Sequence, residues 1–230
     1  MQLIPLGVSG AYPKVNGATS GYLVKTDSVL LFDVGSGVVS RIQKYVNIKD
    51  INGIFLTHYH FDHICDLFVL RHHEYLASGN KITVYGPKSS CLEGTAIKNY
   101  PEFNFVGVNV GDEIKIGQTT VKVGVAKHVN EAVSYKICAD KTLYYTGDTK
   151  YCQEVEDFAK DADVILCDTF KPQSKMTSTV PHMSFEEGLA LSKLANAKLL
   201  GTHVHPNCVE DANAYLGQEN IAKEETLYNL

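Results

Sequence analysis

The sequence predicts an α/β protein with the architecture of an αββα sandwich, in which two central sheets pack face to face beneath outer helices. Two observations lead to this prediction. In each half of the chain, β-rich runs separated by turns come first and segments with helical periodicity follow. No linker, repeat or low-complexity stretch divides the 230 residues, so we expect a single domain over residues 1–230.

The first half should open with strands and continue with helices. Short apolar or alternating runs between Gly, Asn, Asp and Ser residues mark the strands, and the apolar residues at 38, 39, 42 and 46 have helical spacing. We therefore expect strands at 3–8, 21–25, 29–33, 53–56 and 81–85, helices at 38–46 and 64–77, and a loop with a helix at 87–100.

The second half should repeat that order. Residues 103–146 alternate short β-rich runs with Gly turns. The helix expected at 184–194 opens with Ser184 and Glu187 in capping-box register. The remaining elements are helices at 154–160 and 209–216 and buried strands at 164–167 and 198–202.

Composition favours a soluble, cytoplasmic protein. The net charge of -5 does not suggest a general nucleic-acid-binding surface, which is usually basic. The six Cys residues form no C-x-x-C pair, which indicates reduced thiols. The N-terminus lacks a charged signal region, and no apolar run approaches the roughly 18 residues that a membrane span needs. We therefore expect neither secretion nor membrane insertion.

The most informative stretch is 57–63, which reads T-H-Y-H-F-D-H and directly follows the apolar run 53–56. A lone His is usually a surface or core residue, but four ligand-type side chains within six positions indicate a metal motif. Imidazole with carboxylate suits zinc and, less selectively, manganese or iron. The candidate ligands in this stretch are His58, His60, Asp62 and His63.

Three later residues lie where further ligands would be needed. His128, Asp148 and His203 each follow a predicted strand and lie in a turn. Side chains on such loops can converge at one edge of the sheets. Taken singly, each is a weak candidate, but the motif at 57–63 makes all three stronger.

The chain resembles the metallo-β-lactamase superfamily. The matching features are T-H-Y-H-F-D-H at 57–63, His128 after a strand, T-G-D-T at 146–149 and G-T-H at 201–203, in the order found in that family. The resemblance implies the αββα sandwich and two Zn²⁺ per chain, with Mn²⁺ or Fe as alternatives. It implies one metal held by His58, His60 and His128, a second held by Asp62, His63 and His203, and Asp148 bridging the two.

Such a pair of metals indicates a hydrolase. Two ions roughly 3.5–4 Å apart can share a bridging hydroxide, which is a nucleophile at neutral pH. They also stabilise the charge that develops on the oxygen under attack. Asp62 is expected to serve catalysis as well as metal binding.

Asp168 and His182 resemble a pair found in ribonuclease Z and its relatives. There an acidic residue before Thr-Phe is followed by a His before Met, Ser or Thr, and the pair supplies a proton to the leaving oxygen. The chain has Asp168 before Thr-Phe and His182 before Met-Ser, although ribonuclease Z commonly has Glu at the first position. The alternative is that His182 simply caps the helix that begins near Ser184. We favour the acid.

Other features bear on the substrate. Ribonuclease Z carries a long arm for transfer RNA between the residues matching His128 and Asp148, and this chain has no room for one. The closest likeness is to small, arm-less bacterial metallo-hydrolases of that branch, whose opening contains A-Y-P and A-T-S-G-Y, as residues 7–22 do here. Lys171 and Lys175 suit a phosphate, although a solvated loop explains them equally well. His205 is left outside the ligand set.

We therefore expect a dinuclear zinc phosphodiesterase acting on small nucleotides or RNA ends. The first alternative is an acyl hydrolase, namely a thioesterase, glyoxalase II-like enzyme or lactonase, because acyl transfer needs the same hydroxide and oxyanion site. The second is an iron oxygenase or a catalytically silent metal-binding module. Relatives are often dimers, so a homodimer is also an open expectation.

Overall fold

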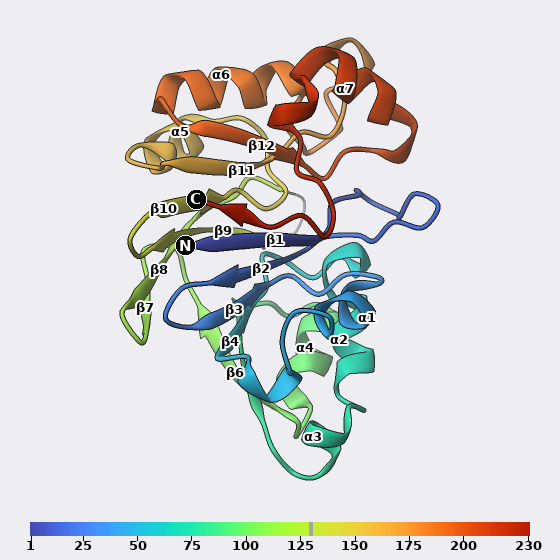
Figure 1. The fold of residues 1–230 in the computed structure, drawn as a ribbon, viewed down its shortest axis with the longest axis vertical. Coiled ribbons are helices and arrows are strands. Elements are labelled where there is room, and N and C mark those ends of the chain that lie inside the picture. The colour runs from blue at the N-terminus through green and yellow to red at the C-terminus, as the bar shows by residue number, and fades with distance from the viewer. Residues whose placement is uncertain (129–130) are drawn as a thin grey trace.

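The computed structural model describes residues 1–128 and 131–230. Two β-sheets pack face to face, and helices cover the outer face of each (Figure 1). This arrangement confirms the expected αββα sandwich. Within the described ranges, no helix is long and apolar enough to cross a membrane.

The N-terminal sheet combines an antiparallel edge with a parallel interior. β1, β2 and β3 are antiparallel neighbours, whereas β3 through β6 run parallel. Its strands, in spatial order, are β13 (Tyr228–Asn229), β1 (Gln2–Gly7), β2 (Gly21–Lys25), β3 (Val29–Phe32), β4 (Gly53–Phe55), β5 (Ile82–Pro87) and β6 (Phe103–Val108). The two-residue strand β13 was not expected from the sequence.

The C-terminal sheet is built in the same mixed way. β10, β11 and β12 run parallel, and β7, β8, β9 and β10 form antiparallel pairs. Its strands, in spatial order, are β12 (Lys198–Thr202), β11 (Val164–Asp168), β10 (Thr142–Tyr145), β9 (Val133–Cys138), β8 (Thr119–Val125) and β7 (Glu113–Ile116).

Helices from each half cover their own sheet (Figure 1). The N-terminal half contributes α1 (Val38–Ile42), α2 (Phe61–Leu70), α3 (Glu74–Ala77) and α4 (Leu92–Asn99). The C-terminal half contributes α5 (Gln153–Ala159), α6 (Phe185–Ala195) and α7 (Val209–Leu216). The expected capping box of α6 is present, with Ser184 as the N-cap and Glu187 as its partner.

The single helix expected at 64–77 is wrong. α2 begins earlier, at Phe61, and ends at Leu70, and a separate short helix α3 begins at Glu74. The Nδ1 atom of His73 accepts a hydrogen bond from the backbone N–H of Tyr75 and so caps α3. A capping side chain offers the backbone an alternative to helical continuation, which apolar periodicity does not reveal.

Alternation along the strands divides the core between the two faces of each sheet. On β3, Leu30 and Phe32 point into the space between the sheets, while Leu31 packs under the N-terminal helices. Phe32 stacks on Phe55 at 5.0 Å, and Phe55 stacks on Tyr85 at 4.6 Å. Burying each such ring stabilises the fold by on the order of 2 kcal/mol. The rings therefore hold the strands of the N-terminal sheet in fixed positions.

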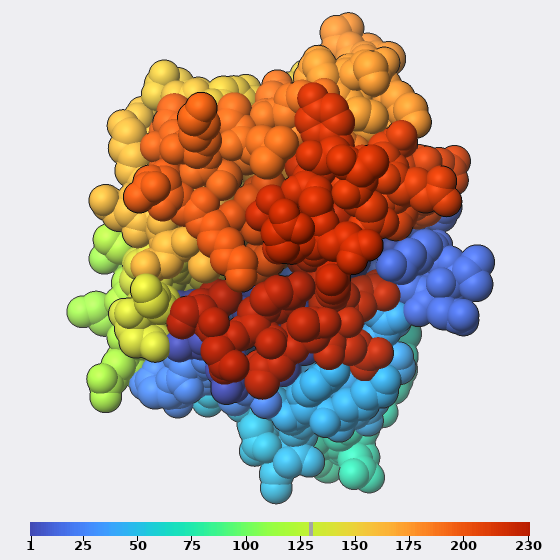
Figure 2. All heavy atoms as spheres, turned by 45° about the horizontal axis from the view of Figure 1, so that its top comes forward, coloured from blue at the N-terminus to red at the C-terminus, as the bar shows by residue number. Residues whose placement is uncertain are grey.

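The sheets bring several strand ends to one edge. β3 and β4 are parallel, as are β10, β11 and β12, so their carboxyl ends lie together within each sheet. The motif at 57–63, Asp148 and His203 follow these strand ends, and Asp168 is the last residue of β11. In the space-filling view, the loop that follows β1 projects beside the orange and red C-terminal third (Figure 2).

Candidate metal centre

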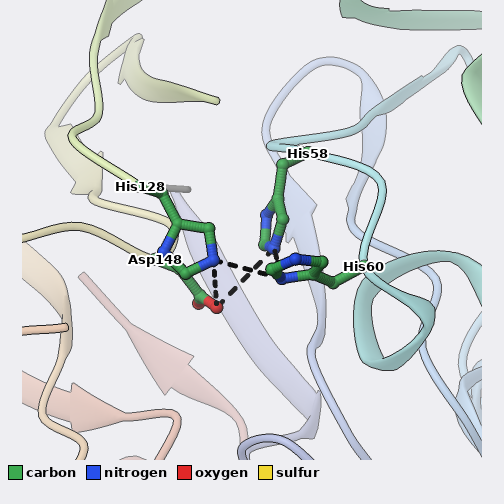
Figure 3. Close-up of side chains that lie close together, drawn as sticks. All are labelled: His58, His60, His128 and Asp148. Carbon is green, nitrogen blue, oxygen red and sulfur yellow. Dashed lines mark hydrogen bonds and ion pairs between the residues drawn. The ribbon is translucent and has the colours of Figure 1, made fainter. Parts of the chain in front are cut away.

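Three imidazoles and one carboxylate from three segments converge in a first cluster (Figure 3). His60 Nδ1 lies 3.0 Å from His58 Nε2 and 3.1 Å from His128 Nε2. Asp148 Oδ2 lies 3.7 Å from His58 Nε2 and 3.8 Å from His128 Nε2. These four side chains therefore present one ligand atom each to a common point.

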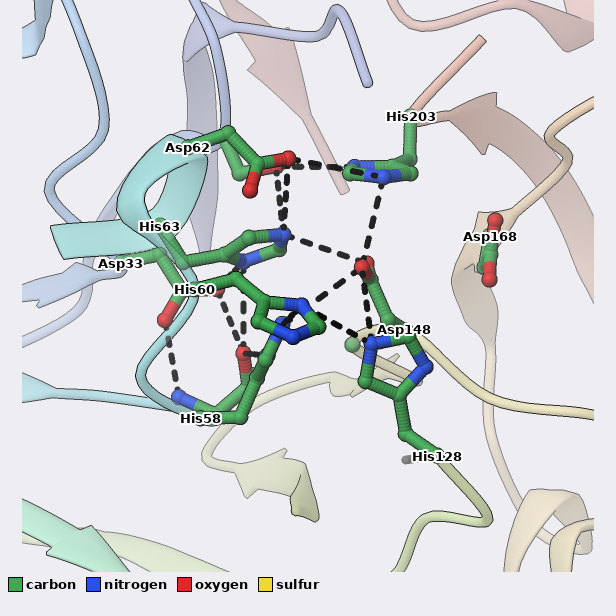
Figure 4. Close-up of polar contacts among 12 residues, drawn as sticks. Asp33, His58, His60, Asp62, His63, His128, Asp148, Asp168 and His203 are labelled. Atoms are coloured by element: carbon green, nitrogen blue, oxygen red, sulfur yellow. Dashed lines mark hydrogen bonds and ion pairs between the residues drawn. The ribbon is translucent and has the colours of Figure 1, made fainter. Parts of the chain in front are cut away.

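A second cluster shares Asp148 with the first (Figure 4). His63 Nε2 lies 3.2 Å from Asp148 Oδ1 and 3.6 Å from Asp62 Oδ2. His203 Nε2 lies 3.3 Å from Asp148 Oδ2 and 3.8 Å from Asp62 Oδ2. The seven residues predicted as ligands thus form two adjacent groups with one carboxylate in common.

Both clusters fit divalent cations. A tetrahedral ion with ligand bonds of about 2.1 Å holds its ligand atoms roughly 3.4 Å apart, which matches the spacing within each cluster. His203 Nε2 and Asp148 Oδ1 are buried and form no hydrogen bond with any described residue. Buried polar atoms rarely lack a partner, so their direction toward the shared centre supports a cation there.

Burial keeps most of these imidazoles neutral, as metal ligands must be. It lowers the pKa of His58 and His203 well below the usual value and that of His128 to about 4. Burial alone would raise the pKa of Asp148, but the imidazoles of His203 and His63 hold it well below its usual range. Asp148 therefore carries the negative charge that two cations would share.

His63 is held by Asp33, a residue that sequence reasoning missed. His63 Nδ1 lies 2.8 Å from Asp33 Oδ2, so its Nε2 faces the shared carboxylate. Asp33 is fully buried and also accepts hydrogen bonds from the N–H and hydroxyl of Thr57 and from the hydroxyl of Tyr145. Its backbone is left-handed, with φ of 55°. This carboxylate fixes the ring orientation of His63 and the start of the ligand loop.

Other ligands are oriented from behind in the same way. His128 Nδ1 donates to the carbonyl of Pro181 at 2.9 Å, which directs Nε2 at the first cluster. His203 Nδ1 lies 3.1 Å from Ser20 Oγ. Gly10 packs directly on His203, since a Cβ at Gly10 would lie 2.2 Å from the ring. These contacts set the ring positions to which a cation would bind.

Asp168 and His182 form a pair beside the shared carboxylate. His182 Nδ1 lies 2.9 Å from Asp168 Oδ2 and 3.9 Å from Asp148 Oδ2. Burial lowers the pKa of His182, but the Asp168 carboxylate outweighs it and raises the pKa to about 9. Burial raises the pKa of Asp168 to about 6 despite the favourable charge of His182. His182 does not cap α6, because Ser184 does.

The two lysines of the loop after β11 have different surroundings. Lys175 Nζ lies 2.6 Å from Asp211 Oδ2 in an exposed ion pair. Lys171 Nζ lies 4.8 Å from the centre of the Phe170 ring, and it has no ion-pair partner among the residues that the structure describes. Of these two lysines, Lys171 is therefore the one that is available to bind an anion near the metal centre.

Comparisons with known proteins place the chain in a family. A family model described as anti-Pycsar protein Apyc1 matches residues 1–228. The chain is similar to the probable metallo-hydrolase YhfI of Bacillus subtilis, with 29% identity over 97% of each protein. It is also 32% identical to the ribonuclease Z of Methanopyrus kandleri over 70% of this chain and 58% of that protein.

Solved structures show the same architecture. The crystal structure of the metallo-β-lactamase fold protein YhfI from Bacillus subtilis has a TM-score of 0.88 and 26% identity, covering 99% of this chain and 98% of that one. The short form of human tRNase Z has a TM-score of 0.78 at 18% identity, covering 100% and 99%, which shows a common fold.

These likenesses establish the metallo-β-lactamase fold, and the relatives' names support a metal-dependent hydrolase. The expected resemblance to the ribonuclease Z-like branch is confirmed as well. The matching family model spans nearly the whole chain. This protein therefore belongs to the family of the anti-Pycsar protein Apyc1.

Proposed function

We propose that this protein is a phosphodiesterase that acts on nucleotide or RNA-type phosphodiesters with two divalent cations, for which zinc is the best-suited ion. The observation that carries the proposal is the His182–Asp168 pair, which lies beside a carboxylate shared by two ligand clusters. Metals bound there would supply a hydroxide at neutral pH and stabilise negative charge on the phosphoryl oxygens.

The pair gives the reaction a proton donor on the leaving-group side. Asp168 accepts from Nδ1 of His182, so Nε2 is the atom that can deliver a proton. As the new bond from the attacking oxygen to phosphorus forms, the P–O bond to the leaving group breaks. The leaving oxygen takes the proton from Nε2, which yields an alcohol and a phosphate monoester.

This donor favours phosphodiesters over acyl esters. An alkoxide leaving group needs protonation, whereas a thiolate leaves readily without it. The ribonuclease Z of Methanopyrus kandleri, whose name denotes an RNA-cleaving enzyme, supports the same choice of bond. The segment from His128 to Asp148 contains the hairpin of β9 and β10, so we propose small nucleotides or RNA ends as substrates rather than a long transfer RNA.

The test combines metal analysis with activity. Purified protein should contain about two metal ions per chain and should hydrolyse bis(p-nitrophenyl) phosphate. A panel of 3′,5′-cyclic mononucleotides, dinucleotides and short RNA then identifies the class of diester. S-Lactoylglutathione serves as the acyl substrate. Thioester cleavage without any diester cleavage would replace the proposal with an acyl hydrolase.

Two substitutions sharpen the result. His203→Ala should reduce the metal content to about one ion per chain, because it removes a ligand from the second cluster alone. Lys175→Ala is the matched control, since its side chain is paired with Asp211. Full metal content in His203→Ala would contradict the proposed division of the ligands.

A further inference from the structure

A row of aromatic rings leads from the metal centre to the surface. Phe170 stacks on His182 with ring centres 4.3 Å apart and lies 5.8 Å from His203. His205 meets the Phe170 ring edge-on at 5.3 Å, and Tyr12 meets His205 edge-on at 5.6 Å. The row therefore starts at the pair that supplies the proton and ends at a tyrosine that is 48% exposed.

The backbone fixes both ends of this row. The N–H of Gly10 donates to the carbonyl of Val204 at 3.3 Å, which ties the loop bearing Tyr12 to the strand end bearing His203. The N–H of His205 donates to the carbonyl of Phe170 at 3.0 Å. The rings are thus held against each other by main-chain contacts, as a preorganised surface requires.

Polar groups along this row remain available. Lys171 lies above Phe170 and has no ion-pair partner among the described residues, although its carbonyl is fixed by the N–H of Phe185 at 3.0 Å. His205 Nδ1 accepts from the N–H of Asn207 at 3.2 Å, so its Nε2 carries the proton and can donate. A cation over the Phe170 ring and a half-exposed phenol against the His205 ring therefore flank two adjacent rings, one of which carries an N–H donor.

We propose that Tyr12, Lys171 and His205 form a subsite for the leaving group of the substrate. The rings of Tyr12 and His205 bind a nucleoside, and Lys171 binds an additional phosphate on that nucleoside. The inference rests on the proposed function, because His182 defines which side of the phosphorus the leaving group occupies. Aromatic rings suit nucleobases through stacking, and an unpaired ammonium suits a phosphate. The subsite thus selects diesters whose leaving group is a nucleotide.

The test compares a dinucleoside monophosphate with the same dinucleotide carrying one extra terminal phosphate, at either end in turn. For the wild type, one of the two extra phosphates should raise kcat/KM by roughly tenfold or more, as a charge-assisted contact allows. Lys171→Ala should abolish this gain, and Lys175→Ala should keep it. A gain that survives Lys171→Ala, or no gain from either phosphate, would overturn the subsite.

Tyr12→Ala tests the ring contact. It should raise KM for dinucleotides much more than KM for methyl p-nitrophenyl phosphate, whose leaving group is a single small ring without a sugar or a second phosphate. If both substrates respond equally, Tyr12 has only a structural role and the base contact is refuted. If the wild type hydrolyses neither substrate, the proposed function itself fails.

A binding measurement keeps the subsite testable without turnover. Nucleoside 3′- and 5′-monophosphates are titrated into metal-free protein and followed by NMR. We expect Lys171→Ala to weaken binding of one of them by roughly tenfold and Lys175→Ala to leave it unchanged. Equal affinities for the wild type and Lys171→Ala would refute the phosphate contact, whatever the activity of the enzyme.

Discussion

His182 and Asp168 meet across two separate segments of the chain, with Nδ1 of His182 lying 2.9 Å from Oδ2 of Asp168. Asp168 ends β11, and His182 precedes α6. The N–H of Thr149 donates to the same carboxylate oxygen at 3.1 Å, which ties the pair to the loop that carries Asp148. One connected set of hydrogen bonds therefore positions His182, the proposed proton donor, and the loop of Asp148, the proposed shared metal ligand.

His182→Ala should lower kcat in proportion to how poorly the leaving group departs. For a nucleoside leaving group, loss of the proton donor should reduce kcat by roughly 10²–10⁴-fold. For p-nitrophenolate, which leaves without a proton, the reduction should be much smaller. A plot of log kcat against leaving-group pKa measures this, and it should be steeper for His182→Ala than for the wild type. Parallel plots would exclude proton donation by His182.

Asp33→Asn should weaken metal binding although Asp33 is not a ligand. The amide cannot accept all the hydrogen bonds that Thr57, Tyr145 and His63 direct at the carboxylate. Loss of such a supporting group typically reduces metal affinity by roughly 10–100-fold. Asparagine also tolerates the left-handed backbone at this position, which limits the damage to the side chain. Competition with a chromogenic chelator measures the affinity.

Asp27→Asn is the matched control for that experiment. Asp27 also accepts hydrogen bonds from a backbone N–H and a threonine hydroxyl, but in an exposed turn outside the ligand clusters. The affinity of the Asp27→Asn protein for metal should equal that of the wild type. If Asp33→Asn also binds metal like the wild type, the Asp33 carboxylate has no role in orienting His63.

Removing metal should lower the melting temperature. The ligand atoms of each cluster lie within 4.8 Å of one another, so without a cation a buried carboxylate is compensated only by imidazoles. A ligand present at a thousandfold excess over its Kd stabilises the native state by about 4 kcal/mol. For a chain of this size, that corresponds to roughly 10 °C. Calorimetry before and after chelation measures the difference, and zinc should restore it. An unchanged melting temperature would argue against tight binding.

The convergence of the seven candidate ligands was predictable because their signal is largely local. Four of the seven candidate ligands lie within the motif at 57–63, and the other three follow strands whose apolar runs are easily identified. Parallel strands then place those ends at one edge of the sheet, as the topology confirms for β10 and β12 beside β11. Short-range patterns thus determined which side chains meet.

The surroundings of the ligands were not predictable, because they depend on contacts between distant segments. Asp33 lies at a strand end like many other aspartates. Only the packed sheets show that its carboxylate accepts hydrogen bonds from Thr57, His63 and Tyr145. His205 and Tyr12 are far apart in the chain and meet through the bond between Gly10 and Val204. No periodicity or motif records such contacts.

Glu102→Gln should destabilise the protein at neutral pH and have little effect in acid. Arg71 Nη2 lies 3.0 Å from Glu102 Oε1, and this hydrogen bond lowers the pKa of Glu102. A carboxyl group with a lowered pKa stabilises the fold above its unfolded pKa of about 4.3, and the effect disappears as pH falls through the folded value. Melting curves of the wild type and of Glu102→Gln at pH 7 and about pH 3 measure this contribution with the carboxyl group ionised and protonated.

Glu113→Gln provides the comparison. Glu113 pairs with Lys122 at 3.1 Å on an exposed hairpin, where ion pairs contribute little. Its substitution should change the melting temperature less than Glu102→Gln at pH 7. If Glu102→Gln causes the same decrease at both pH values, packing against Arg71 rather than charge accounts for its contribution.

Gly10→Ala should disturb the second ligand cluster although Gly10 is not itself a candidate ligand. A Cβ at Gly10 would lie 2.2 Å from Cδ2 and Nε2 of the His203 ring, so the ring must move. Displacing a catalytic ligand by about 1 Å can cost roughly 100-fold in rate. We therefore expect metal content near one ion per chain and a matching loss of kcat/KM. Gly107→Ala, where the atoms nearest the new Cβ belong to the flexible side chain of Lys88, should retain both. Wild-type metal content in Gly10→Ala would show that His203 can shift without losing its ion.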